Sequence, residues 1–158
     1  MTAIRVTLAR EGDVSTIAEM SRRLIEHGLP WSWDEERVRR ALRHRESVVI
    51  TARDRRRLAG FAVMEFYDEH AHLCLLAVHP GYRKQGVGRR LLEWLEATAR
   101  TAGIFRINLE LRVGNDGARQ FYRKLGYREF GVRRAYYAGR EDALRMTRDL
   151  TVVPASRT

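Results

Sequence analysis

The sequence has few residues that stiffen or cross-link a chain, and it has no long apolar run. Its 158 residues include three prolines and a single cysteine, Cys74. One thiol cannot form an internal disulfide, which is typical of proteins in a reducing cytoplasm. The longest clean apolar run, Leu73–Val78, is six residues long, whereas a membrane-spanning helix needs about 20. We therefore expect a cytoplasmic protein without a secretory signal and without a membrane partner.

Acidic residues are too few to balance the basic ones. The chain has 20 Asp and Glu against 30 Lys and Arg, and its net charge is +10. Such a charge attracts polyanions, including nucleic acid, ribosomes and phosphorylated cofactors. The alternative is an arginine-rich but simply well-solvated surface, because the basic residues recur in separate groups such as Arg37–Arg45 and Arg53–Arg57. We favour this alternative and do not expect nucleic acid to be a substrate.

Hydrophobic periodicity predicts strands and helices along nearly the whole chain. Strands are expected at residues 4–9, 47–54, 58–67, 72–78, 106–112, 127–133 and 143–149. Helices are expected at residues 13–28, with Asp13 as N-cap and Gly28 as stop, and at 34–44, 86–102 and 115–126. The strand His72–Val78 is apolar on both faces, which indicates burial in the middle of a sheet. The order predicts one α/β (α+β) domain at 1–150, with a mixed sheet covered on both faces, and a tail at 151–158.

The stretch His79–Arg90, HPGYRKQGVGRR, joins the buried strand to a leucine-faced helix. Gly86 and Gly88 have no side chains, so a ligand can lie against the main chain there. The first N–H groups of a helix have no acceptor within it, and the helix dipole adds positive charge; both features suit a phosphate. The pattern predicts a pyrophosphate cradle, and the alternative is a turn with solvated basic residues. Those residues are Arg83, Lys84, Arg89 and Arg90.

Two common phosphate-binding loops do not match this stretch. A P-loop ends in Gly-Lys-Ser/Thr, which is absent here. A dinucleotide-binding fingerprint needs a third glycine, which is missing. The cradle therefore belongs to neither class.

The residues around the cradle resemble the GNAT acyltransferase superfamily. Arg83-x-x-Gly86-x-Gly88, preceded by LLAVHPGYR, is similar to its acetyl-CoA loop. The stretches LAVHPGYRKQGVGRRLLEWL, LELRVGNDGARQFYRKLGYRE and RRAYYAGREDALRM, with PWS at 30–32, resemble bacterial ribosomal-protein alanine N-acetyltransferases. The resemblance runs from Ile4 to Leu150. It implies the GNAT fold, with a central, mostly antiparallel sheet of about seven strands and about four flanking helices.

The resemblance also implies a role for each matching position, with acetyl-CoA as cosubstrate. Strand main chain pairs with the pantetheine arm, and the N–H groups of the loop hold the pyrophosphate. The cofactor-binding residues it implies are Leu76, Ala77, Val78, Arg83, Lys84, Gln85, Gly86, Val87, Gly88, Arg89 and Asn115. Glu110 is the implied general base and Tyr122 the general acid. The acceptor groove is bordered by Trp31 and by Tyr136 and Tyr137, which are expected in a loop between the last two strands.

Each of these assignments has a structural alternative. Glu110 could be a solvated residue on an edge strand, and Tyr122 an aromatic packed against the sheet. Tyr136 and Tyr137 could cover the end of the sheet, and Trp31 with Trp33 could simply plug a loop. His79 is expected to be a turn residue. The set Asp68, Glu69, His70 and His72 lacks the four closed ligands of a structural zinc site, so no metal is expected.

Acid–base chemistry favours an N-terminal amine as the acceptor. Its pKa is ~7.8, against ~10.4 for lysine, which corresponds to ~3.5 kcal/mol less deprotonation work. We therefore expect direct acetyl transfer to a protein N-terminus, a ribosomal one by resemblance, with no acyl-enzyme because Cys74 lies within the apolar strand. A small-molecule amine, such as an antibiotic, polyamine or amino acid, is the alternative acceptor. A non-enzymatic module that binds RNA or ribosomes is a further alternative.

Overall fold

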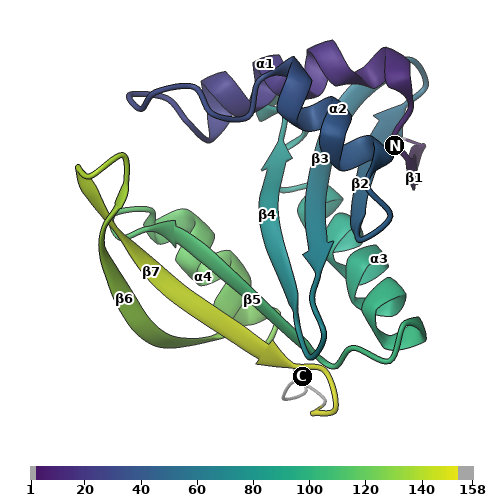
Figure 1. Ribbon diagram of the computed structural model, residues 1–158. Helices are drawn as coiled ribbons and strands as arrows, with labels where there is room; N and C mark the ends of the chain where they lie inside the picture. The colour runs from purple at the N-terminus through teal and green to yellow at the C-terminus, as the bar shows by residue number, and fades with distance from the viewer. Residues whose placement is uncertain (1–2, 153–158) are drawn as a thin grey trace.

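Seven strands form one sheet in the computed structural model, which describes residues 3–152 (Figure 1). Their order is β1-β2-β3-β4-β5-β7-β6; β4 and β5 are parallel, and all other neighbours are antiparallel. This confirms the predicted mixed, mostly antiparallel sheet. The strands are β1 (Ile4–Leu8), β2 (Ser47–Asp54), β3 (Arg57–Phe66), β4 (Ala71–Val78), β5 (Arg106–Arg112), β6 (Arg128–Tyr137) and β7 (Glu141–Asp149).

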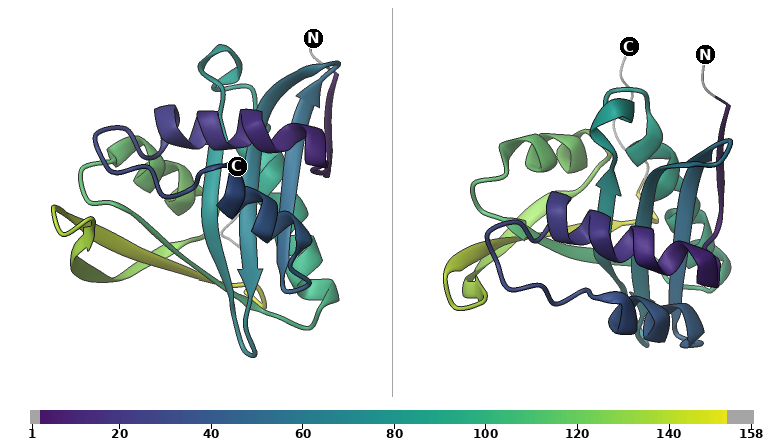
Figure 2. Two further views of the ribbon diagram at one scale, coloured as in Figure 1. Left: turned by 45° about the horizontal axis from the view of Figure 1, so that its top comes forward. Right: turned by 90° about the horizontal axis from the view of Figure 1, so that it is seen from above.

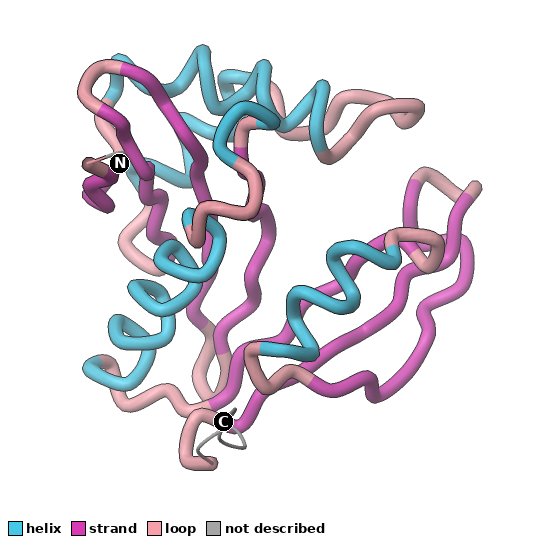
Figure 3. Tube along the Cα trace, turned by 180° about the vertical axis from the view of Figure 1, so that it is seen from behind, coloured by secondary structure: helices cyan, strands magenta, loops and turns pink. Residues whose placement is uncertain are grey.

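Four α-helices cover the two faces of the sheet. Helices α1 (Val14–Leu24) and α2 (Glu35–Arg43) lie together on one face (Figure 2). Helices α3 (Val87–Thr101) and α4 (Asp116–Lys124) lie on the other, which Figure 3 shows from behind. Two short 3-10 helices, η1 (Glu11–Asp13) and η2 (Pro80–Tyr82), precede α1 and follow β4.

Each face of the sheet has its own hydrophobic core. On β5, Ile107, Leu109 and Leu111 belong to the core under α3 and α4, as their alternation predicts. Because side chains alternate along a strand, Glu110 points to the opposite face, the one that α1 and α2 cover. Strand β5 lies between β4 and β7, so Glu110 is not on an edge strand.

Strand β4 contains a β-bulge that the sequence pattern does not reveal. One of its residues, Cys74, has no partner in the register with β3. Leu73 packs into the core under α3, whereas Cys74 and Leu75 both pack toward α1 and α2. A bulge changes the direction of side chains in this way. Cys74 keeps the face of His72, as alternation along the strand requires, and the bulge turns Leu75 onto that face as well.

The parallel ladder between β4 and β5 is short. It pairs Ala71 with Ile107 and ends at Leu73 and Leu109. Beyond that point the two strands separate (Figure 1). Strand β4 is central, as predicted, but alternate residues are only half-buried because its second half lacks a strand on one side.

Two local predictions are wrong, and a third is confirmed only in part. Asp13 is the N-cap residue of α1, as predicted, but its carboxylate accepts from the Arg10 N–H and pairs with Arg53, and it accepts no hydrogen bond from that helix. Helix α1 ends at Leu24, before Gly28. Tyr136 and Tyr137 belong to strand β6 and not to a loop, because the turn to β7 occupies only residues 138–140.

The two ends of the chain add little to these elements. Strand β7 ends at Asp149, and residues 153–158 of the expected tail lie outside the described residues. The proposed domain boundary at 150 thus stays a prediction. Within residues 3–152, no helix combines the length and apolarity needed to cross a membrane.

Helix α3 approaches the sheet closely because β3 has a glycine beneath it. A Cβ at Gly60 would lie 2.8 Å from the carbonyl oxygen of Ala77 and 3.2 Å from side-chain atoms of Val87 and Leu91. Backbone on one side and a packed helix on the other leave no room for it. Gly60 thus sets the position of the first turn of α3 against β4.

We expect Gly60→Ala to lower the free energy of unfolding by about 1–3 kcal/mol, because the added methyl group overpacks this contact. Urea denaturation measures the loss. Gly12→Ala is the matched control, since a Cβ there meets nothing within 4 Å. Equal stability of the two variants would contradict the close contact.

Candidate active site

A pocket of about 700 Å³ opens where β4 and β5 separate. This volume is in the usual range for small-molecule sites. The catalytic candidates Glu110 and Tyr122 line it, as does Tyr137, whereas Gln85, Trp31 and Tyr136 are not among its lining residues. The remaining predicted cofactor residues all line it: Leu76, Ala77, Val78, Arg83, Lys84, Gly86, Val87, Gly88, Arg89 and Asn115.

The first turn of α3 presents bare main chain to this pocket. Gly86 has φ +80°, a conformation that favours glycine, and no side chain caps the helix. The N–H of Arg90 donates to the Gly86 carbonyl at 3.1 Å. The N–H groups of residues 87–89 therefore have no acceptor within the helix. Such an end binds anions, as the sequence predicts.

Helix α4 closes the pocket next to this turn. A Cβ at Gly88 would lie 3.1 Å from the ring of Phe121, so Gly88 allows α4 to lie against α3. The Asn115 carboxamide oxygen accepts from the N–H of Ala118 at 3.1 Å and caps α4. The predicted contact of Asn115 with a ligand stays a prediction.

The opposite wall is the second half of β4. Residues 74–78 extend past the end of the β4–β5 ladder and line the pocket. Main-chain groups on that side can pair with an extended ligand in place of a strand. Together with Arg83, Lys84 and Arg89, the pocket fits an elongated ligand that carries phosphate at one end.

Glu110 is held by a histidine that the sequence analysis did not connect with it. Its Oε1 lies 2.8 Å from Nε2 of His72 on β4, and only 8% of its side chain is exposed. Nothing in the spacing of these residues signals the pair, because it arises from the parallel register of β4 and β5.

Glu110 is ionised at neutral pH. Burial alone would raise the pKa of this carboxyl, but hydrogen bonds from His72 and Tyr136 and the charge of Arg133 hold it below its usual value. A carboxylate can only accept hydrogen bonds, so Nε2 of His72 is the donor. In a neutral ring, Nδ1 then keeps a lone pair, and it faces Cys74 at 3.7 Å.

Tyr122 is suited to hold a proton. It is buried, its ring packs edge-on against Phe121 and Tyr127, and burial raises the pKa of its hydroxyl. The phenol therefore stays neutral over the physiological range and can donate. Tyr122 thus packs in the core, as its structural alternative had it, and also lines the pocket.

Cys74 is less hidden than the sequence indicates. It lies within strand β4, as predicted, but its side chain is only half-buried and shares a face with His72. Burial and the neighbouring Glu65 raise the pKa of its thiol. A protonated thiol is a poor nucleophile, so the physical reason for expecting no acyl-enzyme becomes its protonation.

The tryptophan segment lies beside the site and not in the pocket. The buried Glu26 carboxylate accepts from the N–H and hydroxyl of Ser32 at 2.8 and 2.6 Å. Trp33 is buried beneath Arg37, whereas Trp31 is 39% exposed near Arg22. The role of Trp31 in acceptor binding stays a prediction.

His79 has the turn role expected of it. Its Nδ1 accepts from the N–H of Gly81 at 3.0 Å and begins η2. The ring thus stabilises the turn between β4 and the loop that leads into α3.

Comparison with known proteins places this geometry in a family. The sequence profile of the Acetyltransferase (GNAT) family matches residues 17–127. The chain belongs to the GNAT acetyltransferase family. The protein is therefore an N-acetyltransferase, and acetyl-CoA is the acetyl donor that GNAT enzymes use. Its fold, family and enzyme class confirm the predictions made from sequence.

Several relatives share most of the chain. The [Ribosomal protein bS18]-alanine N-acetyltransferase of Salmonella typhimurium is 36% identical over 123 residues, 76% of this chain and 81% of the relative. The N-alpha-acetyltransferase RimI of Mycobacterium tuberculosis is 32% identical over 146 residues, 87% of each chain. The crystal structure of the ribosomal-protein-S18-alanine N-acetyltransferase from Escherichia coli superposes with a TM-score of 0.78 at 27% identity, covering 98% and 99% of the two chains.

Acetyl-CoA suits this GNAT pocket. Its diphosphate matches an uncapped helix end that no β-carbon fills, and its extended arm matches the unpaired part of β4. The assignment of individual residues to the cosubstrate stays a prediction.

The lowered pKa of Glu110 predicts a pH-dependent contribution to stability. In the unfolded chain a glutamate titrates near ~4.3. Because the folded value is lower, the carboxylate stabilises the protein above ~4.3, and this contribution is lost as the pH falls through the folded pKa. The stability advantage of wild type over Glu110→Gln should thus shrink as the pH falls below ~4.3 and through the folded pKa of Glu110.

Urea denaturation across this pH range measures the difference. Glu19→Gln, which removes an exposed carboxylate on α1, controls for the loss of one negative charge. A difference between wild type and Glu110→Gln that does not vary with pH would show that Glu110 has an ordinary pKa.

Proposed function

We propose that this enzyme transfers the acetyl group of acetyl-CoA directly to the N-terminal amine of a protein, with a ribosomal protein as the first candidate. The observation that carries the proposal is the buried, ionised Glu110, held by His72 at the opening between β4 and β5. The relatives from Salmonella typhimurium and Mycobacterium tuberculosis, both named as N-terminal or ribosomal-protein acetyltransferases, support the choice of acceptor.

The pocket positions the acetyl donor. Acetyl-CoA supplies an acetyl thioester that an amine can attack. The N–H groups of residues 87–89, with Arg83 and Lys84, hold its diphosphate, and main-chain groups of residues 76–78 align its arm. Such positioning can contribute roughly 7–11 kcal/mol to the acceleration of a two-reactant step.

Glu110 receives the proton that the amine gives up, directly or through a water molecule. The hydrogen bond from His72 keeps the carboxylate oriented and ionised. A carboxylate with a lowered pKa is a weak base. It therefore suits an α-amine of pKa ~7.8 better than a lysine of pKa ~10.4. Near pH 7.8 about half of the α-amine is already neutral, whereas nearly all of the lysine is still protonated.

Tyr122 supplies the second proton transfer. Its neutral hydroxyl lines the pocket and can donate to the departing sulfur, whose conjugate acid titrates near ~8.5. Donation by Tyr122 makes the sulfur a better leaving group without any charged acid in the pocket.

We expect Glu110→Gln to lower turnover by about 10²–10⁴-fold, because it removes the proton acceptor. Tyr122→Phe should lower turnover to a smaller extent. The affinity for acetyl-CoA, measured by calorimetry, should stay within about twofold of wild type in Glu110→Gln, since the carboxylate serves the amine. Glu19→Gln is the control for both assays. A Glu110→Gln enzyme with wild-type turnover would exclude Glu110 as the base.

The acceptor is identified with a library of peptides that differ at their N-termini, incubated with labelled acetyl-CoA and analysed by mass spectrometry. We expect the label on α-amines and none on peptides whose α-amine is blocked. A parallel panel of polyamines, amino acids and aminoglycosides, followed by release of free thiol, tests the alternative acceptor. Turnover on that panel without turnover on any peptide would exclude the proposed acceptor. Tight, salt-sensitive RNA binding without any turnover would favour a binding module.

A further inference from the structure

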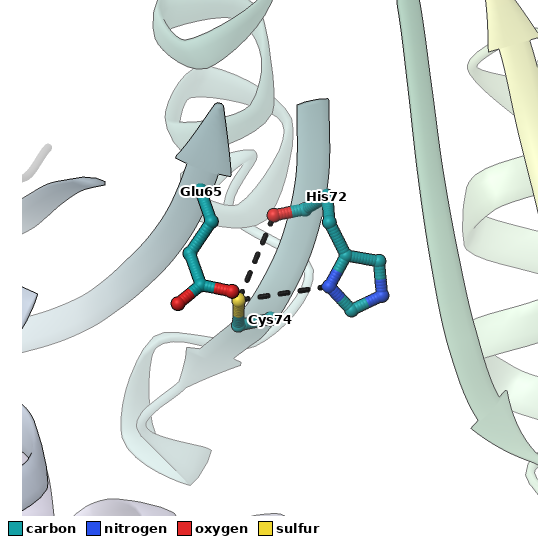
Figure 4. Close-up of side chains that lie close together, drawn as sticks. All are labelled: Glu65, His72 and Cys74. Atoms are coloured by element: carbon teal, nitrogen blue, oxygen red, sulfur yellow. Dashed lines mark hydrogen bonds between the residues drawn. The ribbon is translucent and has the colours of Figure 1, made fainter. Parts of the chain in front are cut away.

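Three potential metal ligands meet on the face of the sheet that carries Glu110. They are Glu65 of β3 and His72 and Cys74 of β4, and their donor atoms all lie within 4.8 Å of one another (Figure 4). Glu65 lies directly opposite His72 in the β3–β4 register, and Cys74, two residues further along β4, points to the same face as His72. The sequence spacing argues against a metal site formed by Asp68, Glu69, His70 and His72. The present set is a different one, because it shares only His72 with that group.

The spacing of these atoms is close to that of a bound ion. The Cys74 Sγ lies 3.7 Å from Nδ1 of His72. In a tetrahedral zinc site, bonds of about 2.3 Å to sulfur and 2.05 Å to nitrogen place the two ligands about 3.5 Å apart. A shift of a few tenths of an ångström would thus suffice for coordination by these two residues.

The surroundings of His72 match those of a metal-binding histidine. Such a residue donates its second ring N–H to a carboxylate, which fixes the ring and exposes the lone pair of the other nitrogen. Here Nε2 donates to Glu110 at 2.8 Å, and Nδ1 faces Cys74. The His72 side chain is 24% exposed, so an ion can reach it from solvent.

We propose that Glu65, His72 and Cys74 bind a zinc-class divalent cation and that the bound ion blocks acetyl transfer. A set of one sulfur, one nitrogen and one carboxylate favours Zn²⁺ over Mg²⁺ or Ca²⁺, which prefer oxygen ligands. Three protein ligands leave the fourth tetrahedral position open. Coordination replaces the Cys74 S–H bond with a metal–sulfur bond, and the proton passes to solvent.

The open position explains the block. A neutral amine is a good zinc ligand, so an acceptor that enters beside Glu110 would bind the ion through the lone pair it needs for attack. The ion also fixes His72, which orients Glu110. The metal site itself is independent of the proposed function, whereas its inhibitory effect depends on it. Inhibition should compete with the acceptor and not with acetyl-CoA.

Metal binding is tested first without turnover. Tag-free full-length protein, kept reduced with a phosphine and freed of metal with a chelator, is titrated with Co²⁺. We expect one equivalent to produce a thiolate-to-cobalt charge-transfer band and the visible bands of a tetrahedral ion, and Zn²⁺ to displace it. A wild-type protein without a charge-transfer band would overturn the site.

Matched variants locate the site. Cys74→Ser should abolish the charge-transfer band, and Cys74→Ser and Glu65→Gln should each weaken Zn²⁺ binding by at least about tenfold in competition with a fluorescent chelator. His70→Gln is the control, because His70 stacks on Tyr67 in the β3–β4 turn, outside the cluster. Unchanged Zn²⁺ affinity in both Cys74→Ser and Glu65→Gln would overturn the assignment.

Turnover is then measured with and without Zn²⁺, each variant being normalised to its own rate in chelator. We expect Zn²⁺ to inhibit wild type reversibly, and Cys74→Ser to need at least about tenfold more Zn²⁺ for the same inhibition. Cobalt binding without inhibition by Zn²⁺ would overturn the regulatory part alone. Lack of acetyl transfer to any peptide would leave the cobalt result unaffected, so failure of the proposed function and failure of the metal site are distinguishable.

Discussion

The parallel ladder between β4 and β5 stops after three residue pairs, and this early stop creates the pocket. Where β4 and β5 are paired, at Ala71–Leu73 and Ile107–Leu109, the sheet is continuous. Past the ladder, the main chain of residues 74–78 does not have β5 beside it and lines the pocket. Glu110 lies at this opening, beside His72. If β5 were paired with β4 along its whole length, it would fill the pocket. A ligand could then not reach the N–H groups at the start of α3.

A buried ion pair links the two sides of the opening. Glu96 of α3 and Arg148 of β7 are 4% and 8% exposed, and their side chains are 2.7 Å apart. The Tyr127 hydroxyl donates to the same carboxylate at 2.9 Å. The helix that carries the cradle is thereby tied to the strands beyond the opening. Removing one partner of such a pair is costly, because the other charge is left buried alone.

The two sides of the opening differ in chemistry. The side of α3 and α4 offers N–H groups and basic side chains, which suits a phosphorylated donor. The side of α1 and α2 offers the Glu110–His72 pair and the potential metal ligands Glu65 and Cys74. In the proposed reaction, donor and acceptor approach Glu110 from opposite faces of one sheet, and the proposed ion blocks only the side of the acceptor.

Local features of this protein could be predicted from the sequence, because they depend on neighbours within a few residues. The helices and strands follow from hydrophobic periodicity, and the cradle follows from Gly86 and Gly88 at the start of a helix. The assignment of a role to Glu110 and Tyr122 came from family resemblance, not from periodicity or spacing. The C-terminal ends of α1 and β6 were predicted less well. The Asp13 side chain does not cap α1 because it pairs with Arg53 of β2, a contact that local sequence does not reveal.

The sequence by itself thus determined most of the elements, the family and the glycine-flanked start of α3 where a phosphate cradle is predicted. Only the tertiary structure decided which side chains meet. The Glu110–His72 pair joins residues 38 positions apart and depends on the register of β4 and β5, and a one-residue bulge decides that Leu75 faces α1 and α2 together with Cys74. Register and bulges are set by how whole strands pack on their cores, and a shift of one residue sends every side chain to the other face.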